Sequence, residues 1–255
     1  MLCYLKLVKY NKNLRRKLNI KKIDYINFSE RVIIDLYPRN RLDRGQHPFI
    51  NINENKRQYF HIYFDDNITE ENRTYITEND RVNRIRIIIE NEIKSFAKLF
   101  RFCNCIERIN FVKCDNKKIT NLDSIFMHCS SLIDINISNL KTDNVTNMGS
   151  MFSVCSALTN LNLSNFNTQN VFTMYQMFFT CKSLLNLIIN GFDTSNITNM
   201  DCMFHECINL RNLDIRNFNI AKVNKIDRMF SGCKAELKDS IKQQLPNLQA
   251  KAFRD

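Results

Sequence analysis

The sequence predicts an α/β solenoid, a right-handed coil with a narrow parallel sheet along one side, a β-rich N-terminal cap and a helical C-terminal cap. Apolar side chains return at the same positions around each of six cysteines, which recur every 26 residues: Cys103, Cys129, Cys155, Cys181, Cys207 and Cys233. A fixed period of about 20 to 50 residues is typical of stacked repeats, in which each unit buries its apolar face against its neighbours. With 44% hydrophobic residues, the chain can build such a core.

Each repeat is predicted to contain one short helix and one short strand. In the copy VTNMGSMFSVCSALTNLNLSNF, apolar residues stand at i, i+3, i+6 and i+7 before the cysteine, namely at Val145, Met148, Met151 and Phe152. That spacing favours one stripe of a short helix. The Leu-x-x-Leu-x-Leu motif after the cysteine ends with a period of two, which favours a short strand. Strand–helix–parallel strand connections are right-handed, hence the predicted handedness.

An asparagine stands just before the apolar stripe in the regular copies. We expect its side-chain oxygen to cap the first turn of the predicted helix. The residues concerned are Asn144, Asn170 and Asn196.

The chain divides into four segments by pattern. They are a basic, largely helical N-terminal segment at 1–48, a β-hairpin-rich cap at 49–92, about six repeats at 93–234, and a capping helix at 235–255. Within the first segment, 23–36 is expected to be irregular and 37–45 to be a loop. In the cap we expect one hairpin formed by 49–52 and 59–64, and a second formed by 74–76 and 84–89.

Positive charge is concentrated at the start of the chain. The net charge is +11, and residues 1–60 carry 14 basic and 5 acidic side chains. A basic amphipathic helix at 1–22 could bind nucleic acid or an anionic membrane, or could be a cap with a solvated face. The basic residues involved are Lys6, Lys9, Lys12, Arg15, Arg16, Lys17, Lys21 and Lys22.

The cysteine positions favour buried free thiols over a ladder of disulfides, because a small thiol beside Met-Phe fills core space without strain. The first residues do not resemble a secretory signal, and no window approaches the ~20 apolar residues of a membrane span. We therefore expect a cytoplasmic protein with reduced cysteines.

No catalytic, cofactor or metal site is expected from the sequence. The four glycines are isolated, so a phosphate-binding loop is not predicted. His128 beside Cys129, and His205 near Cys207, are the only pairs that resemble a nucleophile and its base, but both cysteines occupy core positions of the repeat.

Two further clusters contain residue types that can bind metal or transfer protons. One is a loose zinc candidate whose spacing matches no tight metal-binding motif: Cys103, Cys105 and Cys114. The other is a group of carboxylates that we expect to be a solvated loop: Asp65, Asp66, Glu70 and Glu71.

The repeats resemble the BspA-type leucine-rich repeat family, known from bacterial surface lipoproteins and expanded in some single-celled eukaryotes. The resemblance rests on strings such as MFSVCSALTNLNLSNFNTQNV and NITNMDCMFHECINLRNLDIRNF, and covers about Ile93 to Cys233. It implies a leucine-rich-repeat-like fold and a protein-binding or adhesive role, with the cell surface as the alternative location. The sequence departs from those relatives because no signal, lipidation sequence or anchor is recognisable in it.

Side chains that alternate with the strand leucines should face outward, on the concave face of the array. They form polar columns that could bind a protein partner, or could satisfy one another along the sheet. Ile188, Asp214 and Arg216 break the pattern of their columns, which favours function there. The predicted partner-binding residues are Arg108, Asp134, Asn136, Asn160, Asn162, Asn186, Ile188, Asn190, Asn212, Asp214 and Arg216.

The leading functional hypothesis is therefore a non-enzymatic protein–protein interaction module without a cofactor or a small-molecule substrate. The alternatives are binding of nucleic acid or anionic membrane through the basic N-terminal segment, and a cell-surface adhesin like the bacterial relatives.

Overall fold

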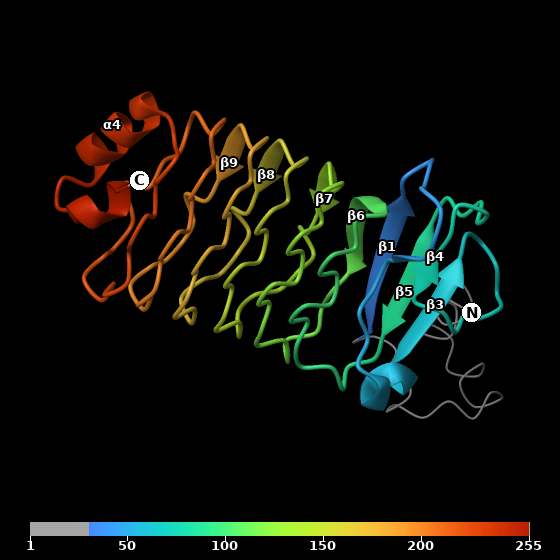
Figure 1. The fold of residues 1–255 in the computed structure, drawn as a ribbon. Helices are drawn as coiled ribbons and strands as arrows, with labels where there is room; N and C mark the ends of the chain where they lie inside the picture. The colour runs from blue at the N-terminus through green and yellow to red at the C-terminus, as the bar shows by residue number, and fades with distance from the viewer. Residues whose placement is uncertain (1–30, 255) are drawn as a thin grey trace.

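The computed structural model describes residues 31–254, and the following concerns that range. A row of stacked coils runs from a five-stranded sheet at one end to helix α4 (Ala235–Gln244) at the other (Figure 1). The basic helix predicted at 1–22, with its candidate binding residues for nucleic acid or membrane, lies outside the described residues.

The five-stranded sheet joins the N-terminal region to the first coils. Its strand order is β3-β5-β1-β6-β7. β1 is antiparallel to both β5 and β6, and β6 is parallel to β7. The strands are β1 (Val32–Pro38), β3 (Phe60–Phe64), β5 (Ile85–Ile89), β6 (Ile106–Lys113) and β7 (Asp134–Asn136).

β1 corrects two predictions. The irregular stretch expected at 23–36 and the loop expected at 37–45 are wrong where they overlap this strand. β1 lies between two other strands and is buried almost throughout, so its sequence, VIIDLYP, does not alternate between apolar and polar residues. Its Asp35 is 3% exposed and accepts two hydrogen bonds of 2.7 Å from the guanidinium of Arg86.

The boundary predicted at residue 48 is also wrong, because β1 pairs with β5 and β2 (His47–Pro48) pairs with β4 (Tyr75–Ile76). Both predicted hairpins have the wrong partners, since β3 and β5 pair with each other. The stretch 49–52 is not a strand, and it is followed by the 3₁₀ helix η1 (Glu54–Tyr59). A period of two identifies a strand but does not name its partner.

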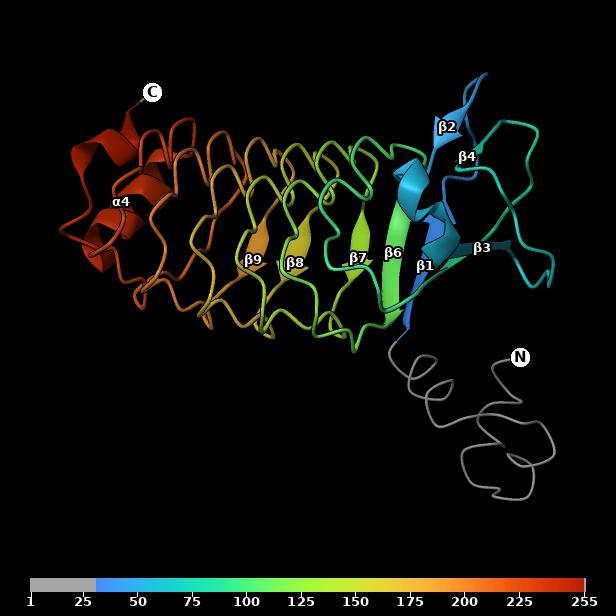
Figure 2. The same cartoon turned by 90° about the horizontal axis from the view of Figure 1, so that it is seen from below.

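The coils stack in register along two parallel ladders. On one side lie β6 and β7, followed by β8 (Asn160–Asn162) and β9 (Asn186–Ile188), and β8 pairs with β9 at a separation of 26 residues. Figure 2 shows the coils side by side. A second line of parallel bridges joins equivalent residues of six successive coils: Ser95, Asn121, Asn147, Thr173, Asn199 and Lys225.

The helix predicted in each repeat is absent, because no residue between Ile93 and Cys233 is α-helical. The backbone forms successive tight turns, with Ser150 and Val154 at φ of 51° and 60°. The N–H of Ser150 donates to the carbonyl of Tyr175 on the next coil at 2.7 Å. Apolar spacing of i, i+3, i+6 and i+7 fits such turns as well as a helix, and the neighbouring coil supplies the acceptors.

The predicted asparagine caps are wrong for the same reason. Asn170 donates through Nδ2 to the carbonyl of Asp143 on the preceding coil at 2.7 Å. Asn144 and Asn196 make the equivalent bonds at 2.8 Å. The asparagines therefore link coils and do not begin helices.

The prediction of buried free thiols is confirmed for the six repeat cysteines. Beside them, one phenylalanine from each coil stacks on the next, with ring centroids 5.3 to 5.9 Å apart. Burial raises the pKa of Cys129 and Cys181 to about 12, so these thiols stay protonated and can donate hydrogen bonds. The stacked rings are Phe100, Phe126, Phe152, Phe178, Phe204 and Phe230.

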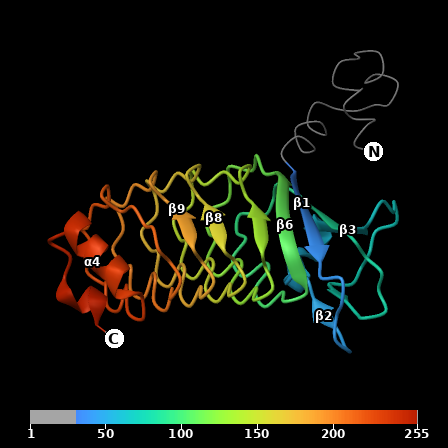
Figure 3. The same ribbon diagram turned by 90° about the horizontal axis from the view of Figure 1, so that it is seen from above.

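The C-terminal residues act as a substitute for one more coil (Figure 3). Phe253, in the 3₁₀ helix η2 (Ala250–Phe253), stacks on Phe230 at 5.6 Å. The N–H of Phe230 donates to the carbonyl of Ala252 at 2.8 Å, in place of the missing neighbour. This contact covers an edge that would otherwise offer unpaired backbone groups.

Candidate partner-binding surface

All eleven predicted partner-binding residues are exposed. The register places Arg108 beside Asp134, and Asn160 beside Asn186, which is itself bridged to Asn212. The residues are not gathered at one point. Arg108 lies at the N-terminal end, with its guanidinium 4.7 Å from the ring centre of Tyr37.

The asparagine columns bond mainly within their own coils. Asn136 Oδ1 accepts from the backbone N–H of Ser138, two residues later, and Asn162 makes the same bond to the N–H of Ser164. One bond crosses between coils, from Nδ2 of Asn186 to Oδ1 of Asn160 at 2.7 Å. Asn186 and Asn160 therefore satisfy each other's hydrogen-bonding groups along the sheet, which is the alternative to partner binding.

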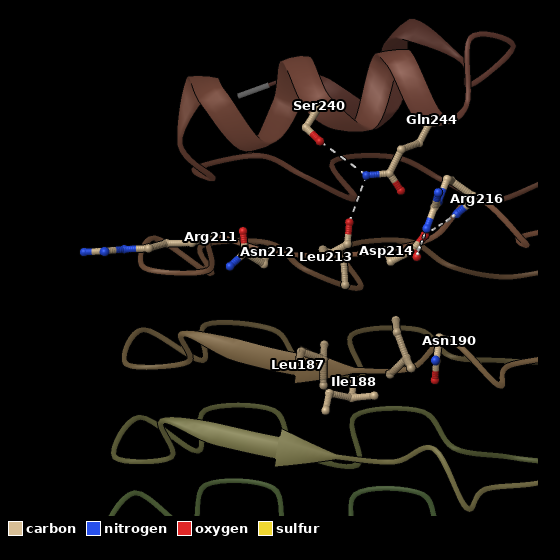
Figure 4. A pocket seen from close by; sticks show the side chains of 11 residues that line it. Leu187, Ile188, Asn190, Arg211, Asn212, Leu213, Asp214, Arg216, Ser240 and Gln244 are labelled. Carbon is tan, nitrogen blue, oxygen red and sulfur yellow. Dashed lines mark hydrogen bonds and ion pairs between the residues drawn. The ribbon is translucent and has the colours of Figure 1, made fainter.

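The residues that break the repeat pattern lie around one pocket of about 520 Å³. Figure 4 shows its walls, formed by the coil of β9, the following coil and α4. Ile188 is 45% exposed, although asparagine occupies the same column on the two preceding coils. The pocket is lined by Ile188, Asn190, Asp214, Arg216, Ser240 and Gln244, among others.

Asp214 and Arg216 form a bidentate ion pair at the pocket. The guanidinium Nε and Nη2 donate to the two carboxylate oxygens at 2.9 and 2.6 Å. The hydrogen bonds from Arg216 lower the pKa of Asp214 to about 2, and those to Asp214 raise the pKa of Arg216. Both side chains are therefore charged at neutral pH, and both remain open to solvent.

Gln244 was not predicted as a site residue, and a glutamine within a helical pattern gives no signal for such a role. Its Oε1 accepts from the N–H of Ile215 at 2.8 Å, and its Nε2 donates to the carbonyl of Leu213 at 3.0 Å. One side-chain amide thus pairs with the last strand-like segment as a neighbouring strand would. The pocket wall on the α4 side is fixed by these bonds.

The histidine–cysteine pairs do not come together. Cys129 is buried and donates to the carbonyl of Phe100 at 2.9 Å, whereas His128 stacks on Phe102 with ring centres 4.6 Å apart. The pKa of His128 is lowered, mainly by desolvation and to a smaller extent by the positive charge of Arg101. The thiol of Cys207 bonds inward in the same way, and His205 stacks on Phe179.

The zinc candidate and the acidic loop make bonds of their own within the fold. Cys105 Sγ donates to the carbonyl of Pro48 at 3.2 Å, and burial raises the pKa of Cys105 and Cys114 to about 12. Among residues 31–254, no group of three or more potential ligands could hold a metal ion. In the acidic loop, Asp65 accepts the backbone N–H groups of Asn83 and Arg84 at 2.9 Å, whereas Asp66 and Glu70 are exposed.

A family model described as Mycoplasma protein of unknown function, DUF285, matches residues 94–188 and again residues 159–250. Together the two matches span the coils and α4, which is more than half of the 255 residues. Neither a curated protein nor a solved structure matches the chain. In the described part of the chain, no helix combines the length and apolar character needed to cross a bilayer.

Proposed function

Because the chain belongs to the family described as Mycoplasma protein of unknown function, DUF285, whose matched residues form the coils, we propose that it is a non-enzymatic binding scaffold for a protein partner. The partner lies on the exposed side of the strands, at the end nearest α4. We further propose that the coils form a leucine-rich-repeat-like solenoid of the BspA type. The parallel pairing of β8 with β9 at the repeat period supports this assignment.

The observation that carries the proposal is the exposure of Ile188 beside the exposed ion pair of Asp214 with Arg216. An exposed aliphatic side chain gains contact area when a partner covers it. The ion pair of Asp214 with Arg216 offers both signs of charge beside this side chain. Complementary charges across an interface favour one partner and one orientation over others.

The shape of the site suggests the kind of partner. The pocket is shallow and is bordered by exposed amides, including that of Asn190. We therefore expect a protein segment that places an apolar side chain against Ile188 and bonds to the amides with its backbone. Folded surfaces and extended segments both carry such groups.

The test compares partner capture by variants that keep the fold. Ile188→Asn installs the residue that the same column carries at Asn162, and the exchange Asp214→Arg with Arg216→Asp reverses the ion pair. The matched control reverses an exposed pair away from the pocket, Lys182 with Glu206, whose charged atoms are 3.3 Å apart.

Proximity labelling or pull-down should recover a specific partner with the wild type and with the Lys182–Glu206 control. Recovery with the two pocket variants should fall about tenfold or more, because loss of a hot-spot residue costs about 2 kcal/mol or more and about 1.4 kcal/mol corresponds to tenfold in affinity. Thermal unfolding should be unchanged in all variants. An equal fall in partner recovery for the control and the pocket variants would contradict the proposal. So would pocket variants that lose their folded structure together with partner recovery.

A further inference from the structure

The turn after β9 places an asparagine directly before a glycine at the surface. The N–H of Phe192 donates to the carbonyl of Ile189 at 3.0 Å, so Asn190 and Gly191 are the two central residues of this turn. Both are exposed, and Asn190 lines the pocket near α4 (Figure 4). No other asparagine in the sequence is followed by glycine. The pair is therefore distinct from the many asparagines of the repeats.

One bond that holds the equivalent turns is missing here. On three other coils, the side-chain oxygen of Asn136, Asn162 or Asp214 accepts the backbone N–H two residues later, at the position equivalent to Asn190. Ile188 stands in the place of these residues and has no side-chain acceptor. The backbone of Asn190 is therefore less restrained than its counterparts.

A second bond is missing at the glycine. Asn139 donates through Nδ2 to the carbonyl of Phe111 on the preceding coil at 3.0 Å, and Asn165 donates to that of Ser138 at 3.2 Å. Gly191 occupies the same position and has no side chain with which to make this bond. The turn after β9 thus lacks both of the side-chain bonds that fasten the turns of the two preceding coils.

The two groups that could react with each other are not held apart. Among residues 31–254, neither the side-chain amide of Asn190 nor the backbone N–H of Gly191 forms a hydrogen bond. An asparagine reacts with the backbone nitrogen of the next residue only when the chain can bring that nitrogen to the side-chain carbonyl carbon. Glycine has no Cβ to obstruct this approach and allows the widest range of backbone conformations.

We propose that Asn190 is a site of spontaneous deamidation, which converts it to aspartate and isoaspartate. The backbone nitrogen of Gly191 loses its proton to solvent and attacks Cγ of Asn190. As the new N–Cγ bond forms, the Cγ–Nδ2 bond breaks, and Nδ2 takes a proton from solvent and leaves as ammonia. Water then opens the resulting succinimide ring at one of its two carbonyl carbons, which gives aspartate or isoaspartate.

The products add a negative charge to the pocket. Arg216 occupies the column of Asn190 on the following coil and already pairs with Asp214. A carboxylate at residue 190 competes for this guanidinium and, unlike the amide, cannot donate a hydrogen bond. We therefore expect deamidation to weaken partner binding, a consequence that rests on the proposed function. The deamidation itself does not depend on that function.

Peptide mapping by mass spectrometry tests the site directly. The folded full chain is incubated in mildly alkaline buffer, and the mass gain of deamidation is followed at every asparagine. Asn190 should convert ahead of all the others and should give both aspartate and isoaspartate. Conversion no faster than at Asn139 and Asn165, whose amides are hydrogen-bonded, would overturn the proposal.

Two variants separate the effect of the glycine from that of the missing bond. Gly191→Asn installs the residue of Asn139 and Asn165, and Ile188→Asn restores the acceptor that Asn162 supplies. Conversion at Asn190 should be lost in Gly191→Asn, and should be slower than wild type in folded Ile188→Asn. Wild-type rates in either variant would overturn the proposal.

The same measurements in urea control for effects on folding. A Cβ at Gly191 would lie 3.1 Å from the carbonyl oxygen of Ser164, so the Gly191→Asn comparison is repeated with both chains unfolded. Conversion should still be lost in Gly191→Asn, because the glycine acts locally. Ile188→Asn should convert like the wild type in urea, because the restored bond exists only in the fold. A slower rate for Ile188→Asn in urea would contradict the role given to the turn.

Partner capture before and after incubation distinguishes this proposal from the proposed function. Recovery of the partner should fall as the converted fraction of the wild type rises, and should stay constant for Gly191→Asn. Conversion at Asn190 in a chain that captures no partner even before incubation would support the modification and contradict the proposed function. Intact capture without conversion would contradict the modification alone.

Discussion

The thiol of Cys155 donates a hydrogen bond of 3.1 Å to the backbone carbonyl of Phe126, which lies 29 residues earlier on the preceding coil. The same carbonyl accepts the N–H of Cys129 on its own coil at 3.0 Å. The carbonyl oxygen of Phe126 therefore closes a turn within its own coil and also binds the next coil. The bond recurs at the same spacing for Cys129, Cys181, Cys207 and Cys233.

Cys155→Ala should destabilise the fold by roughly 1 to 3 kcal/mol. The change removes a buried donor and leaves a small cavity among fully buried side chains. Urea unfolding measures the effect. The control is Cys202→Ala, because Cys202 is only partly buried and stands outside the repeated cysteine position. A loss no larger in Cys155→Ala than in the control would show that the thiol column does not stabilise the stack.

The buried thiols also predict loss of stability at alkaline pH. Their ordinary pKa is 9.0, and in the folded chain that of Cys181 is about 12. The unfolded chain therefore releases this proton first, so the contribution is fully present below pH 9.0 and is lost as pH rises toward 12. Within that window each such thiol should lower the free energy of unfolding by about 1.4 kcal/mol per pH unit.

Urea unfolding from about pH 8 to about pH 10.5, within the window set by this linkage, tests the alkaline prediction. Cys181→Ala removes one titrating thiol. The free energy of unfolding should therefore fall less steeply with pH in this variant, by about 1.4 kcal/mol per pH unit above about pH 9. Tyrosine and lysine residues also titrate there, but their contribution is common to both proteins. An unchanged slope in Cys181→Ala would contradict the role given to this thiol.

Asn170→Asp distinguishes the predicted helix cap from the observed link between coils. Aspartate caps a helix as well as asparagine does, so a cap would tolerate the change. In the structure the side-chain amide donates to the carbonyl of Asp143, and a carboxylate cannot donate that bond. We therefore expect a loss of about 0.5 to 1.5 kcal/mol in the free energy of unfolding. Unchanged or increased stability would support a cap.

The repeat period and its buried positions could be predicted, because burial follows directly from apolar periodicity. Val145, Met148, Met151 and Phe152 are all fully buried, as their spacing indicated. The backbone between them could not be predicted from the same spacing. Left-handed conformations at residues such as Ser150 depend on acceptors that only the next coil supplies.

Strand partners and the complete site required the tertiary structure. The partners of β1 are distant in sequence, so its buried apolar run gave no indication of where it pairs. Departure from the repeat did identify Ile188 and the Asp214–Arg216 pair, which the structure brings to one pocket. The same test applied to the turn after β9 would have found Gly191, which stands where three other coils carry asparagine.

Deleting one full period tests most directly whether coils stack as interchangeable units that present the proposed binding surface. Removing residues 145–170 places Thr173 beside Asn121 and lets the thiol of Cys181 reach the carbonyl of Phe126, and the pocket beneath α4 keeps all its residues. Urea unfolding should still show one cooperative transition, since each coil contacts only its neighbours. The dependence of the free energy of unfolding on urea concentration should be weaker, because a shorter array exposes less surface on unfolding. Removing half a period, residues 145–157, should abolish the transition. Equal disruption by both deletions, or equal tolerance of both, would contradict the account.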